Sequence, residues 1–226
     1  LNFTVVGPRP QNLEESPKKD KRRPWGFVLP GILLLFLVLG CMFAEMVMTH
    51  DPLYFNLNHI SEPPGPEFLF GTDAMGRDVF SMIWYGGRIS LTVGVLAAAV
   101  STGIAVLYGC ISGLSCEIID DVMMRFAEIA LSIPSILVVV FIQAIIGQNS
   151  PAAIAVVIGA TGWMNMAKIV RSEVRQIRYS GYVQAAKGMG AGFLYILRRH
   201  FAPGFFSSIL FMVVTNIGSA IGTEST

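Results

Sequence analysis

Residues whose types could support catalysis or metal binding are few and scattered in this sequence. His50 and His59 lie nine positions apart, and imidazole is a common metal ligand, but no cysteine accompanies them in a metal-binding pattern. Asp120 and Asp121 are paired carboxylates of the kind used in general acid–base chemistry, yet no second constellation supports that reaction. We therefore expect no metal site. We interpret the segment around the two aspartates as a solvated connection in which an aspartate pairs with Arg125.

The motifs of an ATP-hydrolysing or proteolytic enzyme are also missing from the sequence. It contains no G-x-x-x-x-G-K-[ST] phosphate cradle, no H-E-x-x-H and no pairing of a nucleophile with a base. We therefore predict that the chain is not an enzyme and carries no cofactor. Any energy that it uses must be supplied from outside the chain.

A polar, glycine-punctuated stretch between two apolar runs is the most informative part of the chain. This stretch, residues 180–203, reads SGYVQAAKGMGAGFLYILRRHFAP. Such a segment cannot lie in hydrocarbon, so it must face water or another protein. Ser180 is placed to cap a short helix, and the glycines at 188, 190 and 192 break that helix before a second one. Because Ala185 and Ala186 offer a small-residue face for close approach, we interpret the stretch as a docking element.

The spacing of this stretch resembles the EAA loop of bacterial ABC importer permeases, which reads EAA, three residues, Gly, nine residues, then I-x-L-P. Gln184, His200 and Ala202 replace the glutamate, isoleucine and leucine of that pattern. In the family, the loop docks in a cleft of a cytoplasmic ATPase and passes its motion to the membrane helices. The alternative is a merely structural loop. The resemblance implies a coupling role for Tyr182, Gln184, Ala185, Ala186, Gly188, Gly190 and Pro203.

A second string, FGTDAMGRD at residues 70–78, is similar to the FGTD-x-x-GRD signature of oligopeptide and dipeptide permeases of the C-subunit type. Its two glycines are expected to form turns, and Thr72 or Asp73 to cap a short helix. Arg77 and Asp78 are placed to form a local pair. A related branch of the family imports nickel, so nickel and dipeptide remain alternatives to oligopeptide. Further strings that look most like oligopeptide permease C subunits lie at 108–113, 122–125 and 169–171.

Composition points to an all-α polytopic membrane protein, because the 226 residues are 53% hydrophobic and 14% charged, with a mean hydropathy of +0.60. Three cysteines, an odd number, predict no disulfide framework. The predicted order is a cytoplasmic basic tail at 1–26, a span at 27–48, an extracytoplasmic loop at 49–88 and a permease core at 89–226. Within that core the predicted spans are 89–114, 126–147, 152–170 and 204–226.

The resemblance implies the transmembrane fold of a type I ABC importer, in which five of six spans are visible here. The sequence begins at Leu1 rather than methionine and ends where relatives continue, so we expect it to be truncated at both ends. Small residues at four-residue spacing predict that the 89–114 helix is packed inside a bundle. These residues are Gly94, Ala98 and Thr102, followed by Gly109 and Gly113.

Two further features of the spans bear on transport. Pro134 lies inside the third predicted span, where proline kinks a helix, so it is a candidate for lining the pathway. After the fourth span, Arg171, Arg175 and Arg178 share one face of an amphipathic extension whose apolar stripe is formed by 169, 170, 174 and 177. We expect these arginines to meet lipid phosphates rather than an ATPase.

The distribution of basic residues predicts the orientation. Residues 1–26 hold six Lys and Arg, and 168–200 hold seven, whereas 49–88 hold only two. By the positive-inside rule the N-terminus and the docking stretch are both cytoplasmic, in a bacterial inner or plasma membrane. The resemblance implies four kinds of partner: two ATPase subunits, a homologous second permease, an extracytoplasmic binding protein and the lipid bilayer. No pattern favours nucleic acid.

An ATP-independent secondary transporter or channel is the competing class. It would require polar or ionisable residues buried in the middle of spans. Gln143 and Asn165 are the main polar candidates, and both lie near the ends of predicted spans. A non-transporting scaffold would explain the apolar runs but would leave the docking stretch without a role.

Overall fold

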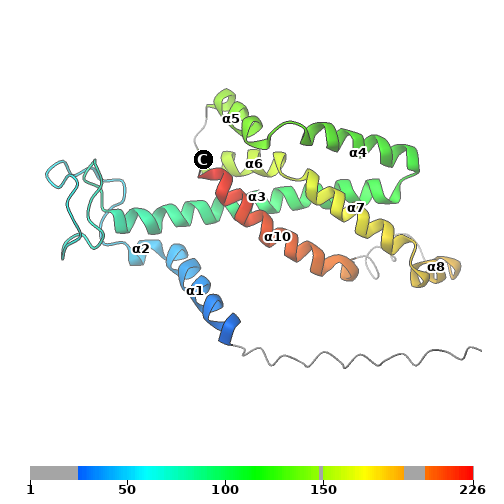
Figure 1. Ribbon diagram of the computed structural model, residues 1–226, viewed down its shortest axis with the longest axis horizontal. Coiled ribbons are helices and arrows are strands. Elements are labelled where there is room, and N and C mark those ends of the chain that lie inside the picture. The colour runs from blue at the N-terminus through cyan, green and yellow to red at the C-terminus, as the bar shows by residue number, and fades with distance from the viewer. Residues whose placement is uncertain (1–24, 148–149, 191–201, 226) are drawn as a thin grey trace, which may run out of the picture. The chain divides into compact units, whose positions relative to one another are not determined.

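The computed structural model describes residues 25–147, 150–190 and 202–225, and the chain divides into two compact units, 1–40 and 41–226. Among these described residues the regular elements are helices, apart from one isolated bridge between Thr72 and Asp78 in the non-helical segment 48–78. Figure 1 shows the helices α1 (Trp25–Met42), α2 (Ala44–Val47), α3 (Val79–Leu114), α4 (Glu117–Leu131), α5 (Ser135–Ile146), α6 (Pro151–Thr161), α7 (Met164–Arg178), α8 (Gly181–Gly188) and α10 (Ala202–Glu224).

Several predicted boundaries are wrong at polar segments that turn out to be helical. The last ten residues of the predicted 49–88 loop are helical and belong to the 36-residue helix α3, which begins at Val79. The predicted solvated connection at 115–125 is mostly the first part of α4, which begins at Glu117. The first predicted span is divided at Phe43 between α1 and α2.

The third and fourth predicted spans are each broken into two helices. The chain bends by 77° between α4 and α5, and by 49° between α6 and α7. Pro134 is not inside a helix as predicted, because α5 starts one residue later at Ser135. Proline has no N–H to donate and disfavours helical geometry in the residue before it, so the first helix ends ahead of it. In the other pair Gly162 ends α6 and Trp163 precedes α7.

The described residues hold one helix, α3, that is long and apolar enough to cross a membrane. Up to three candidates result if each bent pair counts as one span. The predicted count of five spans is therefore not confirmed. Shorter apolar stretches lie within α1, at Val28–Met42, and within α10, at Ser208–Glu224.

Helix α3 is the centre of the second unit, where it packs against α6, α7 and α10 (Figure 1). A Cβ at Gly109 would lie 2.7 Å from the carbonyl oxygen of Ala167 on α7, closer than real Cβ atoms approach. Gly113 meets α7 and Gly94 meets α10 in the same way. The prediction that small residues pack this helix inside a bundle is confirmed.

The FGTDAMGRD string folds into turns that start α3. Both glycines predicted to form turns, Gly71 and Gly76, have positive φ angles, of 75° and 73°. The predicted cap and ion pair are wrong, since Asp78 caps α3 by accepting from the Ser81 backbone N–H, and Arg77 pairs with Asp73 at 2.7 Å. This arrangement leaves Asp78 free of Arg77 and buries it beneath the loop.

Candidate functional site

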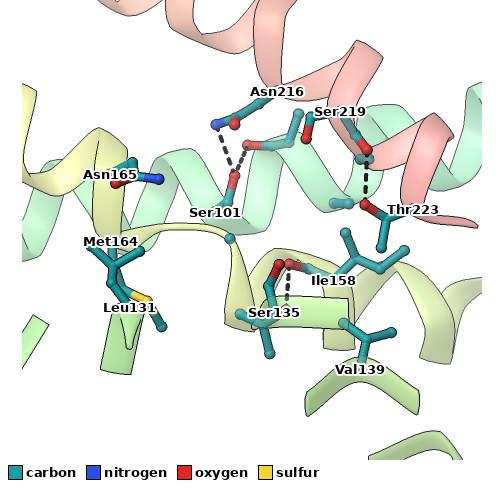
Figure 2. Close-up of a pocket in the computed structure, with 15 residues that line it drawn as sticks. Ser101, Leu131, Ser135, Val139, Ile158, Met164, Asn165, Asn216, Ser219 and Thr223 are labelled. Carbon is teal, nitrogen blue, oxygen red and sulfur yellow. Dashed lines mark hydrogen bonds between the residues drawn. The ribbon is translucent and has the colours of Figure 1, made fainter. Parts of the chain in front are cut away.

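A small cavity lies where α3, α6 and α10 meet the two helix breaks. Its volume is about 190 Å³. Figure 2 shows that Ser101 comes from α3, Ser135 and Val139 from α5, Met164 and Asn165 from the start of α7, and Asn216 from α10. The remaining lining residues are Ala97, Ala98, Leu131, Ile158, Thr161, Gly162, Ser219, Ala220 and Thr223.

The polar groups at this cavity are neutral hydroxyls and amides. Asn216 Nδ2 donates to Ser101 Oγ at 3.3 Å, and Ser101 Oγ in turn donates to the carbonyl oxygen of Ala98 (Figure 2). Thr223 Oγ1 donates to the carbonyl of Ser219 at 3.0 Å. Among the described residues that line the cavity none carries a charge. Such a lining can exchange hydrogen bonds with a neutral polar solute, but it supplies no counter-ion.

Both helix breaks reach this cavity from sequence-distant parts of the chain. Leu131 ends α4 and Ser135 starts α5, while Thr161 and Met164 flank the second break. Interrupted helices expose unpaired backbone groups, and in membrane proteins such groups are tolerated where they line a cavity. Pro134 itself is not among the lining residues; its neighbour Ser135 is. Two polar residues, Gln143 and Asn165, were considered as signs of an ion pathway. Asn165 lines the cavity and Gln143 does not.

The predicted docking stretch begins with α8, which presents two different faces. Val183 and Ala186 are buried, with Ala186 only 5% exposed, and they join the core cluster that contains Val174 and Ile177 of α7. Ala185 is exposed. The expectation of a paired-alanine face is therefore wrong, since adjacent residues on a helix point about 100° apart. The predicted coupling residues on the exposed side are Tyr182, Gln184, Ala185, Gly188 and Gly190.

Side-chain hydrogen bonds connect α8 to the end of α7. Gln184 Nε2 donates to the carbonyl oxygen of Arg178 at 3.1 Å. The Ser180 hydroxyl donates backward to the carbonyl of Ile177 at 2.6 Å, so its side chain does not make the predicted cap. Helix α8 ends at Gly188, and Gly190 follows with a φ of +82°.

The rest of the docking stretch is described only at its end. The predicted second helix and Gly192 fall within 191–201, outside the described residues. Pro203 lies in the first turn of α10, which begins at Ala202, a position that proline tolerates because the first N–H groups of a helix have no partner inside it.

The arginines expected at the lipid surface face the protein instead. Arg171 donates to both oxygens of Asp120, with Nε at 2.6 Å from Oδ1, and Arg175 Nη1 lies 2.9 Å from Oδ2. Arg178 donates to three carbonyl oxygens at the C-terminal end of α3, those of residues 113–115. Cations are favourable at that end of a helix dipole.

Asp120 is the residue whose importance sequence reasoning missed. It is 2% exposed and also accepts a hydrogen bond from Ser112 on α3, which contradicts the expectation of a solvated aspartate. Arg125, which was expected to form an ion pair with an aspartate of this segment, instead pairs with Glu128 at 3.0 Å. The sequence shows that Arg171 and Arg175 are one helical turn apart and so share a face, but this spacing does not identify their partner.

The two histidines considered as metal ligands lie in the loop before α3. Their rings flank Phe68, with centroids 5.0 Å and 5.5 Å away. His59 Nδ1 lies 2.8 Å from Glu62 Oε1, and His50 Nδ1 lies 3.7 Å from Asp78 Oδ2. In the part of the chain that the structure describes, no group of three possible ligands comes together to hold a metal ion.

Comparison with known proteins identifies relatives over most of the chain. The oligopeptide transport system permease protein OppC of Bacillus subtilis (strain 168) is 36% identical over 86% of this chain and 63% of its own length. The dipeptide transport system permease protein DppC of the same strain is 37% identical, over 85% and 60% respectively. The glutathione transport system permease protein GsiD of Pectobacterium atrosepticum is 31% identical, over 88% and 66%. This chain therefore spans 60–63% of the length of the two B. subtilis permeases.

The resemblance to peptide permeases of ABC importers is confirmed by these matches. A family model described as "Binding-protein-dependent transport system inner membrane component" matches residues 105–226, which include α4 to α10 and most of the cavity. An all-helical architecture with apolar helices agrees with a membrane permease. The chain belongs to the family of binding-protein-dependent transport system inner membrane components.

Proposed function

We propose that this chain is a permease subunit of an ATP-driven importer of peptides, with oligopeptides as the foremost substrate class. The observation that carries the proposal is its similarity, over 85–86% of its length, to permease proteins whose names specify oligopeptide and dipeptide transport. The chain would form half of a translocation pathway, with a second permease of the same family forming the other half.

The cavity at the two helix breaks supports a role in that pathway. Its hydroxyl and amide groups match the donors and acceptors of a peptide backbone, which every peptide presents whatever its side chains. A secondary transporter coupled to protons would need an ionisable group at its site, and the described lining residues offer none. In this proposal Pro134 acts indirectly, because it holds the break that brings Ser135 to the cavity.

The exposed side of α8 is the proposed contact with a cytoplasmic ATPase. Tyr182, Gln184 and Ala185 would meet the ATPase, while Val183 and Ala186 anchor the helix in the permease core. Closure of two ATPase subunits on ATP would then move α8 as part of a rigid body and shift the helices around the cavity. In the proposed orientation, which follows the positive-inside rule, α8 and the basic N-terminal tail lie in the cytoplasm. The 49–78 loop then lies on the side where a binding protein would deliver substrate.

The experiment that tests the proposal uses the full-length protein purified with a tag in mild detergent from its native membrane. Subunits that co-purify are identified by mass, and the complex is placed in liposomes with its binding protein to measure ATP-dependent uptake of radiolabelled trialanine. We expect ATPase subunits and ATP-dependent uptake. Intact protein that recovers no ATPase, or uptake that needs no ATP, would contradict the proposal.

A further inference from the structure

The carboxylate of Asp120 joins three helices at one buried point. It accepts hydrogen bonds from Arg171 and Arg175 of α7 and from the hydroxyl of Ser112 on α3. The carboxylate side chain is only 3% exposed, while the arginine side chains are 25% and 37% exposed. A buried carboxylate is strongly dependent on its partners, since loss of one partner leaves an uncompensated charge. These three contacts make Asp120 the central residue of a clamp between α4 and α7.

Helix α4 depends on this clamp because it buries little apolar surface within the chain. Its hydrophobic side chains are largely exposed, and among them only Met124 and Ala127 are buried. Its other connections are also polar: Tyr108 Oη of α3 donates to the carbonyl of Met123 at 2.6 Å, and Lys168 of α7 lies 3.7 Å from Glu128. The position of α4 relative to α7 is therefore set mainly by polar contacts, of which those of Asp120 are the most buried.

The opposite ends of α4 and α7 connect the clamp to two different sites. Helix α7 leads through Tyr179 and Ser180 into α8, to which it is fixed by the Gln184 hydrogen bond and by the shared core. Helix α4 ends at Leu131, which lines the cavity at the break before α5. Asp120 is thus the most buried link by which a displacement of α8 and α7 would reach α4 and, through Leu131, the α4 side of the cavity wall.

We propose that Asp120 is a positioning residue that transmits movement of α8 to the α4–α5 break, so that ATP hydrolysis and substrate movement stay coupled. This inference rests on the proposed function of α8 as the ATPase contact. It distinguishes Asp120 from a purely structural residue in a measurable way. Loss of a structural residue lowers ATP hydrolysis and transport together, because fewer intact complexes remain. Loss of a transmitting residue changes the number of ATP molecules hydrolysed for each peptide moved.

The test measures that ratio in the full-length complex in liposomes, with trialanine as the probe. For Asp120→Asn, which keeps the shape but removes the charge that holds two arginines, we expect assembled complexes in which the ratio rises about tenfold, a typical size for coupling between sites. Asp121→Asn is the matched control, because it removes the same charge from the next residue, which is exposed. Its ratio should equal that of the wild type.

The possible outcomes separate this inference from the proposed function. If the wild-type complex shows no ATP-dependent uptake, the proposed function fails before Asp120 is tested. If the wild type transports and Asp120→Asn keeps the wild-type ratio, the transmission role is wrong. Should Asp120→Asn fail to assemble, Arg175→Gln replaces it, since that variant leaves the two bonds of Arg171 in place. An unchanged ratio in that variant would equally overturn the inference, and a raised ratio would support it.

Discussion

Gln184 of α8 donates a hydrogen bond from Nε2 to the backbone carbonyl of Arg178, the last residue of α7, at 3.1 Å. Only Tyr179 and Ser180 separate the two helices, and the bond spans the turn between them. The EAA pattern has glutamate at this position, and an ionised glutamate has no hydrogen to donate. The amide at 184 therefore gives this chain a link between α8 and α7, which favours movement of the two helices as one body.

The two alanines of α8 should respond differently to the same large charge. Ala185→Arg places a guanidinium on the exposed side and should abolish recovery of ATPase subunits from detergent while the melting temperature of the protein stays unchanged. Ala186→Arg forces the same group into the core beside Val174 and should lower the melting temperature and the yield. Equal effects of the two variants on ATPase recovery and on stability would contradict the assignment of faces.

Close approach of α3 and α7 at Gly109 predicts a strong effect of a single methyl group. Gly109→Ala should destabilise the protein by about 1–3 kcal/mol, the usual cost of overpacking, because the new Cβ meets the Ala167 carbonyl. Gly103→Ala is the matched control on the same helix, where a Cβ meets nothing within 4 Å. That control should be neutral or stabilising, since alanine is the better helix former. Thermal unfolding of the full-length protein in detergent measures both.

Asp78 should tolerate an amide better than it tolerates truncation. Its Oδ2 accepts from the Ser81 N–H, the Ser81 hydroxyl and the Thr49 hydroxyl, whereas its buried Oδ1 has no hydrogen-bond partner. Asp78→Asn keeps one oxygen for those three donors, but it removes the charge and puts an amide N–H group at the buried position of Oδ1, so it should lower stability by less than truncation does. Asp78→Ala removes the cap of α3 and should cost about 1–2 kcal/mol. A loss in the Asn variant as large as that in the Ala variant would show that the charge, rather than the cap, is required.

Acid should loosen the loop before α3 only at low pH. The Arg77 backbone N–H that donates to Asp73 lowers the pKa of that carboxyl below its ordinary value. Burial acts to raise the pKa of Asp78, but hydrogen bonds from Ser81 and Thr49 outweigh it and lower that pKa. Both groups therefore stabilise the fold above about pH 4, near the ordinary aspartate pKa, and the contribution disappears as the pH falls through their lowered values. Protease cleavage of the loop should be constant from pH 7 to 5. It should rise only at a pH below about 4, where an acid-active protease is used. A rise between pH 7 and 5 would contradict this assignment.

Patterns that act within one segment were predictable from the sequence. The small residues of α3 were expected to bring helices together, and Gly109 and Gly113 do so against α7. The docking stretch was expected to start with a short helix that glycines break, and α8 ends at Gly188. In both cases the signal is carried by neighbouring residues on one element, so spacing alone is sufficient.

Features that depend on a distant partner were not predictable in the same way. Asp120 was expected in a solvated connection because its neighbours are charged, yet its arginine partners lie 51 and 55 residues further along the chain. The same contacts explain why Arg171 and Arg175 face protein rather than lipid. Ala186 was assigned to an exposed face because the pattern of small residues does not reveal which side of α8 meets α7.

Asn216 of α10 should be required for the uptake of peptide through the cavity. Asn216→Leu removes the amide that donates to Ser101 and replaces it with an apolar group of similar size inside the proposed pathway. We expect ATP-dependent uptake of trialanine to fall about tenfold or more. Without the Asn216 amide as a donor, the carbonyl groups of the peptide lack a hydrogen-bond partner in the cavity, and each missing hydrogen bond costs about 1–3 kcal/mol. Thr215→Leu is the matched control, since it is the preceding residue, is exposed and does not line the cavity. Recovery of ATPase subunits should be normal in both variants, because α8 is unchanged. Wild-type uptake in Asn216→Leu would remove the cavity from the pathway and leave the exposed surface of the helices, where a second permease would pack, as the route for substrate.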